Sequence, residues 1–116
     1  MKVQINTDAN VDSTEGLVTH VEATLEKTLR HLKERLTRVE VHLSDVNGGK
    51  DGNDDKRCVI EARPKNLQPV SVSHQAGSLH QAIDGAASKL KTSLETVVGR
   101  LDDKRRHAAV DLGEPE

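Results

Sequence analysis

Six histidines and one cysteine are the residues of this sequence best suited to metal binding or nucleophilic chemistry. The histidines stand at positions 20, 31, 42, 74, 80 and 107, and none belongs to a metal-binding pattern such as H-E-x-x-H. Cys58 lies in an alternating apolar stretch, RCVIEAR, which predicts that its side chain is a small core residue and not a nucleophile. The sequence therefore predicts no catalytic residue, no metal site and no cofactor.

The acidic stretch DGNDDKRCVIEA, residues 51–62, resembles a calcium-binding loop in its first half only. Asp51, Asn53 and Asp55 stand at positions one, three and five of such a loop. Lys56 occupies the position that needs glycine, and Ala62 the position that needs a bidentate glutamate. We interpret the segment as a solvated hairpin loop. Acid–base catalysis would need a pocket with paired ionisable groups, so we expect neither an enzyme nor a small-molecule substrate.

Positive charge is concentrated in two segments of the chain. Residues 17–38 contain five Lys or Arg and three Glu, a net charge of +2, and residues 89–106 contain six Lys or Arg and three Asp or Glu, a net charge of +3. Residues 45–55 and 107–116 each carry a net charge of −3. Two cationic helices side by side would attract a polyanion in a salt-sensitive way. Cations on exposed helix faces nevertheless serve solvation more often, and those at 104–106 also suit the helix dipole.

The sequence contains no Phe, Trp or Tyr. Base stacking and aromatic cages are therefore excluded as recognition mechanisms, and a nucleic acid would be held through its phosphates and its shape. A single cysteine cannot form an internal disulfide, and no apolar run is long enough for a signal peptide or a membrane span. These features predict a cytoplasmic protein without membrane contact.

Hydrophobic periodicity predicts the order β-α-β-β-β-α. Alternation predicts strands at 2–6, 38–44, 57–63 and 68–74, and apolar residues recurring every three or four positions predict helices at 17–36 and from a Ser78 cap to about 106. A strand–helix–strand unit favours a parallel pair, and the later strands can follow as an antiparallel meander. We expect an α+β fold in which both helices cover one face of a four-stranded mixed sheet. Residues 1–106 are predicted to form one domain and 107–116 a flexible acidic tail.

Two helical segments in this context carry a resemblance to a known family. TEGLVTHVEATLEKTLRHL, residues 14–32, and SLHQAIDGAASKL, residues 78–90, resemble the ribosome hibernation-promoting and ribosome-associated inhibitor family, also called sigma-54 modulation proteins. The resemblance covers about residues 1–106. It implies a bacterial protein with a fold like that of a double-stranded-RNA-binding domain. It also implies binding to the 30S subunit, or the 70S ribosome, near the decoding region, with translation inhibited under stress.

The resemblance also implies which residues bind 16S rRNA. Lys27 and Arg30 align with basic positions of the family's first helix, and Lys89 belongs to an AID…KL pattern in the second. Family members continue with further basic residues, whereas this chain has TSLETVV at 92–98 and Thr24 where lysine is frequent. The basic surface is therefore thinned at its centre and extended toward the C-terminus. The predicted rRNA-binding residues are Lys27, Arg30, Lys89, Lys91, Arg100 and Lys104.

The thinned surface keeps a second interpretation open. The protein could be an interaction module that kept the fold and lost rRNA binding. Its working surface would then be the acidic loop or the wet face of the sheet, formed by Arg38, Glu40, His42, Arg57, Glu61 and Arg63. In either case we expect a monomer that does not pair ribosomes through the C-terminal domain of longer relatives.

Overall fold

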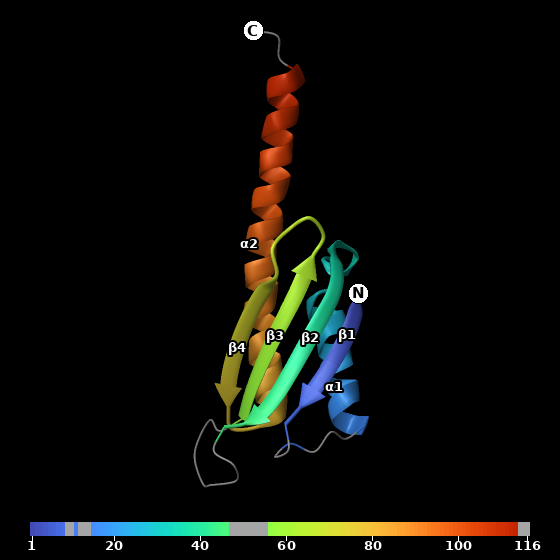
Figure 1. Cartoon of the computed structure of the whole chain (residues 1–116), viewed down its shortest axis with the longest axis vertical. Coiled ribbons are helices and arrows are strands. Elements are labelled where there is room, and N and C mark those ends of the chain that lie inside the picture. The colour runs from blue at the N-terminus through green and yellow to red at the C-terminus, as the bar shows by residue number, and fades with distance from the viewer. Residues whose placement is uncertain (9–10, 12–14, 47–55, 114–116) are drawn as a thin grey trace.

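The computed structural model describes residues 1–8, 11, 15–46 and 56–113, with side chains described as far as residue 104. The elements are β1 (Lys2–Thr7), α1 (Glu15–Thr28), a 3₁₀ helix η1 (Lys33–Arg35), β2 (Leu36–Asp45), β3 (Lys56–Pro64), β4 (Val70–Ala76) and α2 (Leu79–Gly113) (Figure 1). This order confirms the predicted α+β class and the β-α-β-β-β-α sequence of elements. Of the segment interpreted as a solvated hairpin loop, residues 51–55 lie outside the described residues, whereas Lys56–Ala62 belong to β3.

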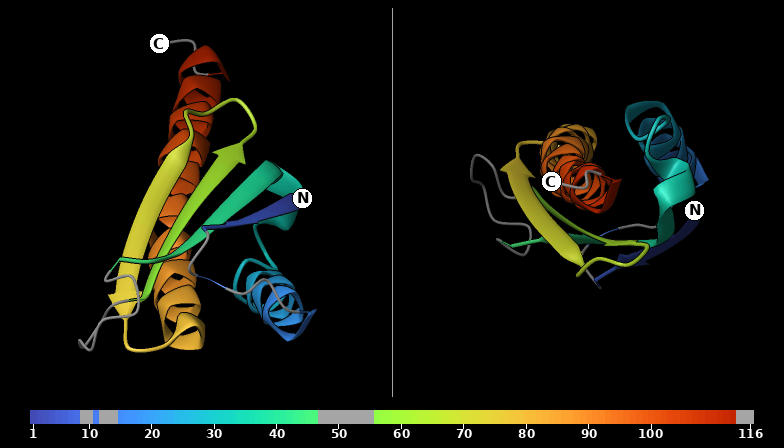
Figure 2. Two further views of the ribbon diagram at one scale, coloured as in Figure 1. Left: turned by 60° about the horizontal axis from the view of Figure 1, so that its bottom comes forward. Right: turned by 90° about the horizontal axis from the view of Figure 1, so that it is seen from above.

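The sheet is mixed, with the strands in the order β1-β2-β3-β4. β1 pairs with β2 in parallel, while β2–β3 and β3–β4 are antiparallel, so α1 forms the crossover that a parallel neighbour requires. Both helices lie on the same face of the sheet, and the opposite face is open (Figures 1 and 2). The predicted mixed sheet with two helices on one face is thereby confirmed.

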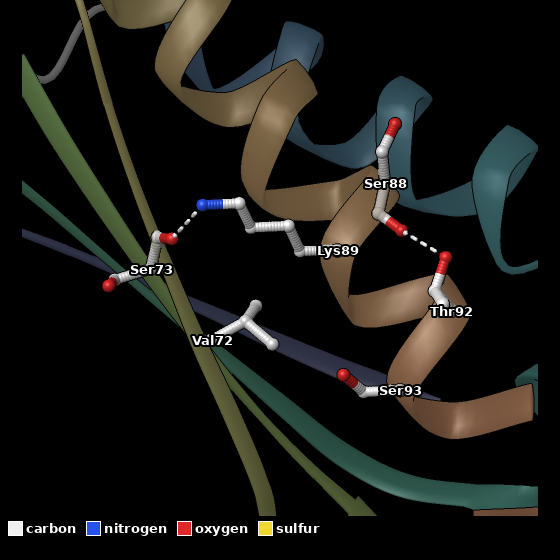
Figure 3. Close-up of a pocket in the computed structure, with 6 residues that line it drawn as sticks. All are labelled: Val72, Ser73, Ser88, Lys89, Thr92 and Ser93. Carbon is white, nitrogen blue, oxygen red and sulfur yellow. Dashed lines mark hydrogen bonds between the residues drawn. The ribbon is translucent and has the colours of Figure 1, made fainter. Parts of the chain in front are cut away.

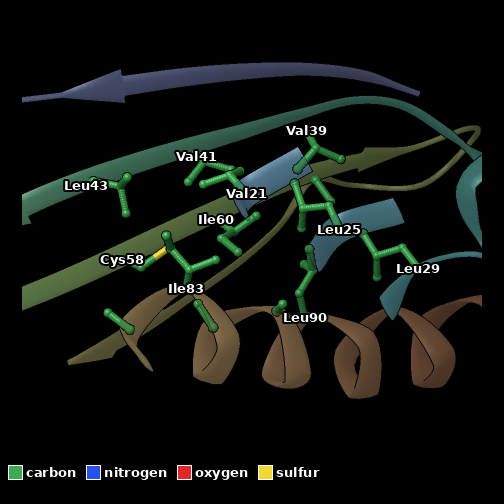
Figure 4. Close-up of a cluster of buried hydrophobic side chains, with 14 of the residues drawn as sticks. Val21, Leu25, Leu29, Val39, Val41, Leu43, Cys58, Ile60, Ile83 and Leu90 are labelled. Atoms are coloured by element: carbon green, nitrogen blue, oxygen red, sulfur yellow. The ribbon is translucent and has the colours of Figure 1, made fainter. Parts of the chain in front are cut away.

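An aliphatic core fills the space between the sheet and the helices (Figure 4). Alternate residues of β2 and β3 point into it, as the alternating pattern predicts. α1 contributes a stripe of leucines and valine, and α2 contributes alanines as well as larger residues. Complete burial of one such leucine, isoleucine or valine stabilises the fold by about 1.5–3 kcal/mol. The fully buried residues include Val21, Leu25, Leu29, Val39, Val41, Leu43, Cys58, Ile60, Ile83, Leu90 and Leu94.

The first helix is shorter than its apolar spacing predicts. We expected a helix to Leu36, but α1 ends at Thr28 and the chain tightens into η1 before β2 begins at Leu36. The amide of Leu32 bonds the carbonyl of Leu29, and the amide of Arg35 bonds that of Leu32, which are three-residue spacings. Leu29, Leu32 and Leu36 are all buried. An apolar spacing of three or four therefore marked burial correctly here without distinguishing an α-helix from 3₁₀ turns.

The fourth strand begins later than predicted. We expected residues 68–74, whereas β4 spans Val70–Ala76. Pro69 has no N–H to donate to a ladder, and Asn66 in the preceding turn has a φ of 64°, a left-handed conformation that asparagine tolerates well. The turn between β3 and β4 therefore occupies the residues before Val70.

The second helix is longer than predicted. The Ser78 hydroxyl accepts a hydrogen bond from the amide of Gln81 at 3.1 Å, which confirms the predicted cap. We expected a flexible tail from residue 107, but α2 continues to Gly113. At 1.5 Å per residue this helix is about 50 Å long and projects beyond the sheet, which gives the molecule a long axis of 67 Å (Figure 1). No helix of the described chain is long and apolar enough to cross a membrane.

Candidate nucleic-acid interface

The outer surfaces of α1 and α2 form the candidate interface. The two helices pack side by side, with α2 over β3 and β4 and α1 beside it (Figure 2). Their inward faces are buried in the core, so the polar and charged residues are confined to the outward faces and to the seam between the helices. The arrangement can present cations from two helices to one extended polyanion.

Two predicted residues lie where α1 ends: Lys27 is in its last turn, and Arg30 is in the turn that follows. Both are exposed, and among the described residues neither ammonium nor guanidinium lies within 4 Å of a carboxylate. The neighbouring Glu26 instead pairs with Lys33, and that ammonium holds the pKa of Glu26 below its ordinary value. Lys27 and Arg30 are therefore available to an external anion.

Lys89 lies on the side of α2 that faces β4. Its ammonium donates a hydrogen bond to the backbone carbonyl of Ser73 at 3.0 Å (Figure 3). Arg100 is eleven residues farther along the helix, about three full turns, and so lies on the same side. Arg100 and Lys104 are exposed. These three predicted residues therefore lie along the flank of α2 that is remote from α1.

Lys91 lies on the opposite flank of α2. Two residues correspond to about 200° of helix rotation, so Lys91 points away from the side of Lys89 and toward the α1 side. Its side chain is half-buried. The six predicted residues are consequently divided among α1, the seam and the far flank of α2. They do not form one compact cluster, and their role in rRNA binding stays a prediction.

A row of carboxylates from α2 occupies the seam between the helices. His20 Nε2 donates to Asp84 Oδ1 at 3.0 Å, and His31 Nε2 donates to Glu95 Oε2 at 2.9 Å. The Arg35 guanidinium binds Asp102 through two bonds of 2.9 and 3.0 Å. These pairs link α1, the turn after it and η1 to three positions along α2 that are about three and two turns apart.

The seam pairs use residues whose role the sequence analysis missed. Asp84, Glu95 and Asp102 are separated by 11 and 7 residues, and both separations return to the same side of a helix. That spacing was available in the sequence, but their partners became evident only when η1 and α1 were placed. The lapse of basic residues between Lys91 and Arg100 therefore coincides with a position, Glu95, that contacts the turn after α1.

At the N-terminal end of the seam, two histidine rings add to the contact between the helices. The rings of His20 and His80 stack with centroids 4.0 Å apart, and Thr24 donates to Asp84 at 3.4 Å. Among the described residues, no group of three or more His, Cys, Asp or Glu is placed to hold a metal ion. These histidines therefore join two helices instead of converging on one point.

The open face of the sheet carries charged residues that pair with one another. In the β2–β3 ladder Arg38 lies opposite Arg63, and Glu40 lies opposite Glu61. Like charges opposite each other repel, but this repulsion is compensated by an ion pair within each strand. Arg38 pairs with Glu40 on β2, and Arg63 pairs with Glu61 on β3. His42 also lies 3.6 Å from Glu40. This alternative surface is therefore engaged mainly in its own ion pairs.

Cys58 is fully buried beneath α2 and Ile83 (Figure 4). Desolvation raises the pKa of its thiol to about 12. The thiolate, which is the reactive form, is therefore scarce at neutral pH, in agreement with the interpretation of Cys58 as a core residue.

Comparison with known proteins places this geometry in a family. The family model described as "Sigma 54 modulation protein / S30EA ribosomal protein" matches residues 3–102. The chain is similar to the N-terminal domain of Thermus thermophilus Protein Y, with 24% identity, a TM-score of 0.67 and coverage of 84% of this chain and 99% of that one. It is also similar to a ribosomal subunit interface protein from Coxiella burnetii, with 13% identity, a TM-score of 0.71 and coverage of 85% and 99%. No curated protein sequence matches this chain.

Proposed function

The chain belongs to the sigma 54 modulation protein / S30EA ribosomal protein family, and we propose that it binds 16S rRNA of the small ribosomal subunit near the decoding region. The family comprises ribosome-associated factors that are not enzymes. The observation that carries the proposal is the family match, which extends over residues 3–102 and so includes α1, the sheet from Val3 onward and α2 as far as Asp102. By occupying the region where messenger and transfer RNA lie, the protein would keep idle ribosomes from translating.

The binding is electrostatic and depends on shape. Without aromatic side chains the protein holds rRNA through cations that contact phosphates, not through stacked bases. Lys27 and Arg30 contact phosphates on the α1 side. Arg100 and Lys104 do so on the far flank of α2, with Lys91 between the helices and Lys89 joining when it leaves Ser73. No cofactor is required, and the ribosome places the site of action in the cytoplasm.

The seam carboxylates determine where phosphates are accepted. Asp84, Glu95 and Asp102 repel an RNA backbone that approaches along the seam. Their partners His20, His31 and Arg35 are already engaged and so supply little free positive charge. The rRNA therefore contacts the two flanks of the helical layer, and the weakened centre predicts a lower affinity than a continuous basic surface would give.

Co-sedimentation with purified 30S and 70S particles tests the proposal. We expect the wild type to pellet with the particles at about 0.1 M salt, where phosphate contacts are still strong. The double variant Lys27→Glu/Arg30→Glu should remain in the supernatant. The matched control Lys2→Glu/Lys65→Glu reverses two exposed cations on β1 and on the turn between β3 and β4, and it should pellet as the wild type does. A wild-type protein that stays in the supernatant would refute the proposal.

The same engaged seam favours one alternative function, that of a protein-interaction module that has lost rRNA binding. Carboxylates lie between the cations of the two helices, which is unfavourable for a nucleic-acid surface. The open sheet face would then bind a protein partner. A pull-down with the tagged chain tests this alternative. It would be favoured if no rRNA is recovered before nuclease treatment and one protein partner is still recovered after it.

A further inference from the structure

β4 is an edge strand that carries no charged side chain of its own. It lies at one end of the strand order, and its seven residues, VSVSHQA, include no Lys, Arg, Asp, Glu or Pro. Such edges expose backbone groups that can pair with another strand, and proteins usually protect them with charged residues or proline. β1, the strand at the opposite edge, carries Lys2. β4 itself therefore supplies neither a charged side chain nor a proline that would protect this edge.

The outward backbone groups of β4 can be assigned from one hydrogen bond. The Ser73 carbonyl accepts a bond from Lys89, so it points away from β3. In an antiparallel ladder the N–H and C=O of one residue point to the same side, and the side alternates along the strand. The N–H and C=O of Ser71 therefore also point outward. Ser71 and Ser73 thus offer a row of backbone groups at the middle of the edge.

A shallow groove of about 540 Å³ runs between this edge and α2 (Figure 3). Small residues line it, and Lys89 is the single charged residue among them. The Lys89 side chain crosses from α2 to β4 over the groove. The lining residues are Val72, Ser73, Ser88, Lys89, Thr92 and Ser93.

We propose that Lys89 guards this edge, and that without its ammonium β4 pairs with β4 of a second copy of the chain. An antiparallel strand pair has two-fold symmetry, so one uncharged strand can serve both partners. A two-fold axis through Ser73 would place Ser73 of one copy opposite Ser73 of the other. The groove leaves room beside α2 for the approach of the second copy.

Lys89 opposes this pairing in two ways. Its ammonium occupies the Ser73 carbonyl, which is the central acceptor of the new ladder. The two-fold axis would also bring the two copies of Lys89 close together, because each reaches the residue on the axis. Bringing two ammonium groups into a newly formed interface is unfavourable through repulsion and desolvation. Lys89 therefore keeps the protein monomeric.

Light scattering on the purified chain, without any ribosome, tests whether Lys89 prevents dimerisation. Lys89→Ala, and Lys89→Met, which keeps the apolar stem, should shift the mass from monomer toward dimer at about 1 mM, where even a weak association is populated. Lys91→Ala is the matched control. It removes the same charge from the opposite flank of α2 and should remain monomeric, as should Lys89→Arg. Circular dichroism identifies a variant that does not fold.

A disulfide trap tests the register. Paired backbone-bonded residues have Cα atoms about 5.5 Å apart, within the range that a disulfide spans. Because Cys58 is buried, Ser73→Cys supplies the one accessible thiol among the described residues. Oxidation should cross-link Ser73→Cys/Lys89→Ala at least tenfold faster than Ser73→Cys/Lys91→Ala. Equal cross-linking rates, together with a monomeric Lys89→Ala at about 1 mM, would overturn the proposal.

Discussion

Gly85 has no Cβ. A Cβ at this position would lie only 2.1 Å from Cδ2 of His74 and 2.6 Å from its Cγ. The contact brings α2 close to β4. Gly99 on the same helix has no atom within 4 Å of such a Cβ. The two glycines look equivalent in the sequence, since each lowers helix propensity, but only Gly85 has a steric reason to be glycine.

We predict opposite effects when these glycines are replaced by alanine. Gly99→Ala should raise the free energy of unfolding by about 0.5–1 kcal/mol, the usual gain in helix propensity. Gly85→Ala should lower it by about 1–2 kcal/mol, because the cost of displacing a packed ring exceeds that gain. Urea unfolding measures both values. In a His74→Ala background Gly85→Ala should become stabilising, and a loss of stability there would show that His74 is not the obstacle.

For individual candidate residues the sequence predicted exposure better than contacts, and their role in rRNA binding stays a prediction. Lys27 and Arg30 are exposed and available, as their positions on an amphipathic helix predict. Lys89 was assigned to rRNA, yet it contacts a carbonyl of β4, an element 16 residues away in sequence. A helix pattern gives the side on which a residue lies, but not which strand edge lies beneath that side. That information requires the tertiary packing.

At the scale of elements, the seam is held by pairs between α2 and the segment from α1 to η1. The Arg35–Asp102 pair has the two-bond geometry that makes arginine–carboxylate pairs strong. It joins η1 to α2. Both side chains are partly exposed, at 44% and 38%, so solvent screens the interaction.

A double-mutant cycle on this pair should give a coupling energy of about 0.5–1 kcal/mol. The cycle compares Arg35→Ala, Asp102→Ala and the double variant by urea unfolding. The coupling should fall when the salt concentration is raised from about 0.1 to 1 M, because the Debye length shortens from about 10 Å to about 3 Å and the ions screen the pair more strongly. A coupling energy near zero at about 0.1 M salt would mean that the pair does not hold η1 to α2.

The elements themselves were largely recoverable from the sequence. Strict alternation at Val39, Val41 and Leu43 identified the buried face of β2 correctly. The end of the first helix was wrong because a 3₁₀ turn keeps the same leucines buried that a longer helix would bury. The end of α2 was also wrong, because we expected a segment with few apolar residues to leave the helix, whereas the helix continues to Gly113. Apolar pattern therefore located the core better than it located element ends.

At the scale of the whole molecule, a net charge of −2 conceals a separation of charge. The described cations of α1 and α2 lie on the helical layer, whereas the charges of the open sheet face largely pair among themselves. The helical layer is therefore the face from which a polyanion can gain the most. The seam carboxylates Asp84, Glu95 and Asp102 reduce this gain.

The salt dependence of ribosome binding tests this account most directly. Titration of fluorescently labelled protein with purified 30S subunits at about 50–200 mM salt gives the slope of log K against log salt, which falls by roughly 0.7–0.9 for each phosphate contacted. We predict a slope of about −3 to −5 for the wild type. For Lys27→Glu/Arg30→Glu we predict a slope shallower by about 1.5–2, with Lys2→Glu/Lys65→Glu unchanged. An affinity that does not depend on salt, or a slope that Lys27 and Arg30 do not alter, would contradict phosphate recognition by the helical layer.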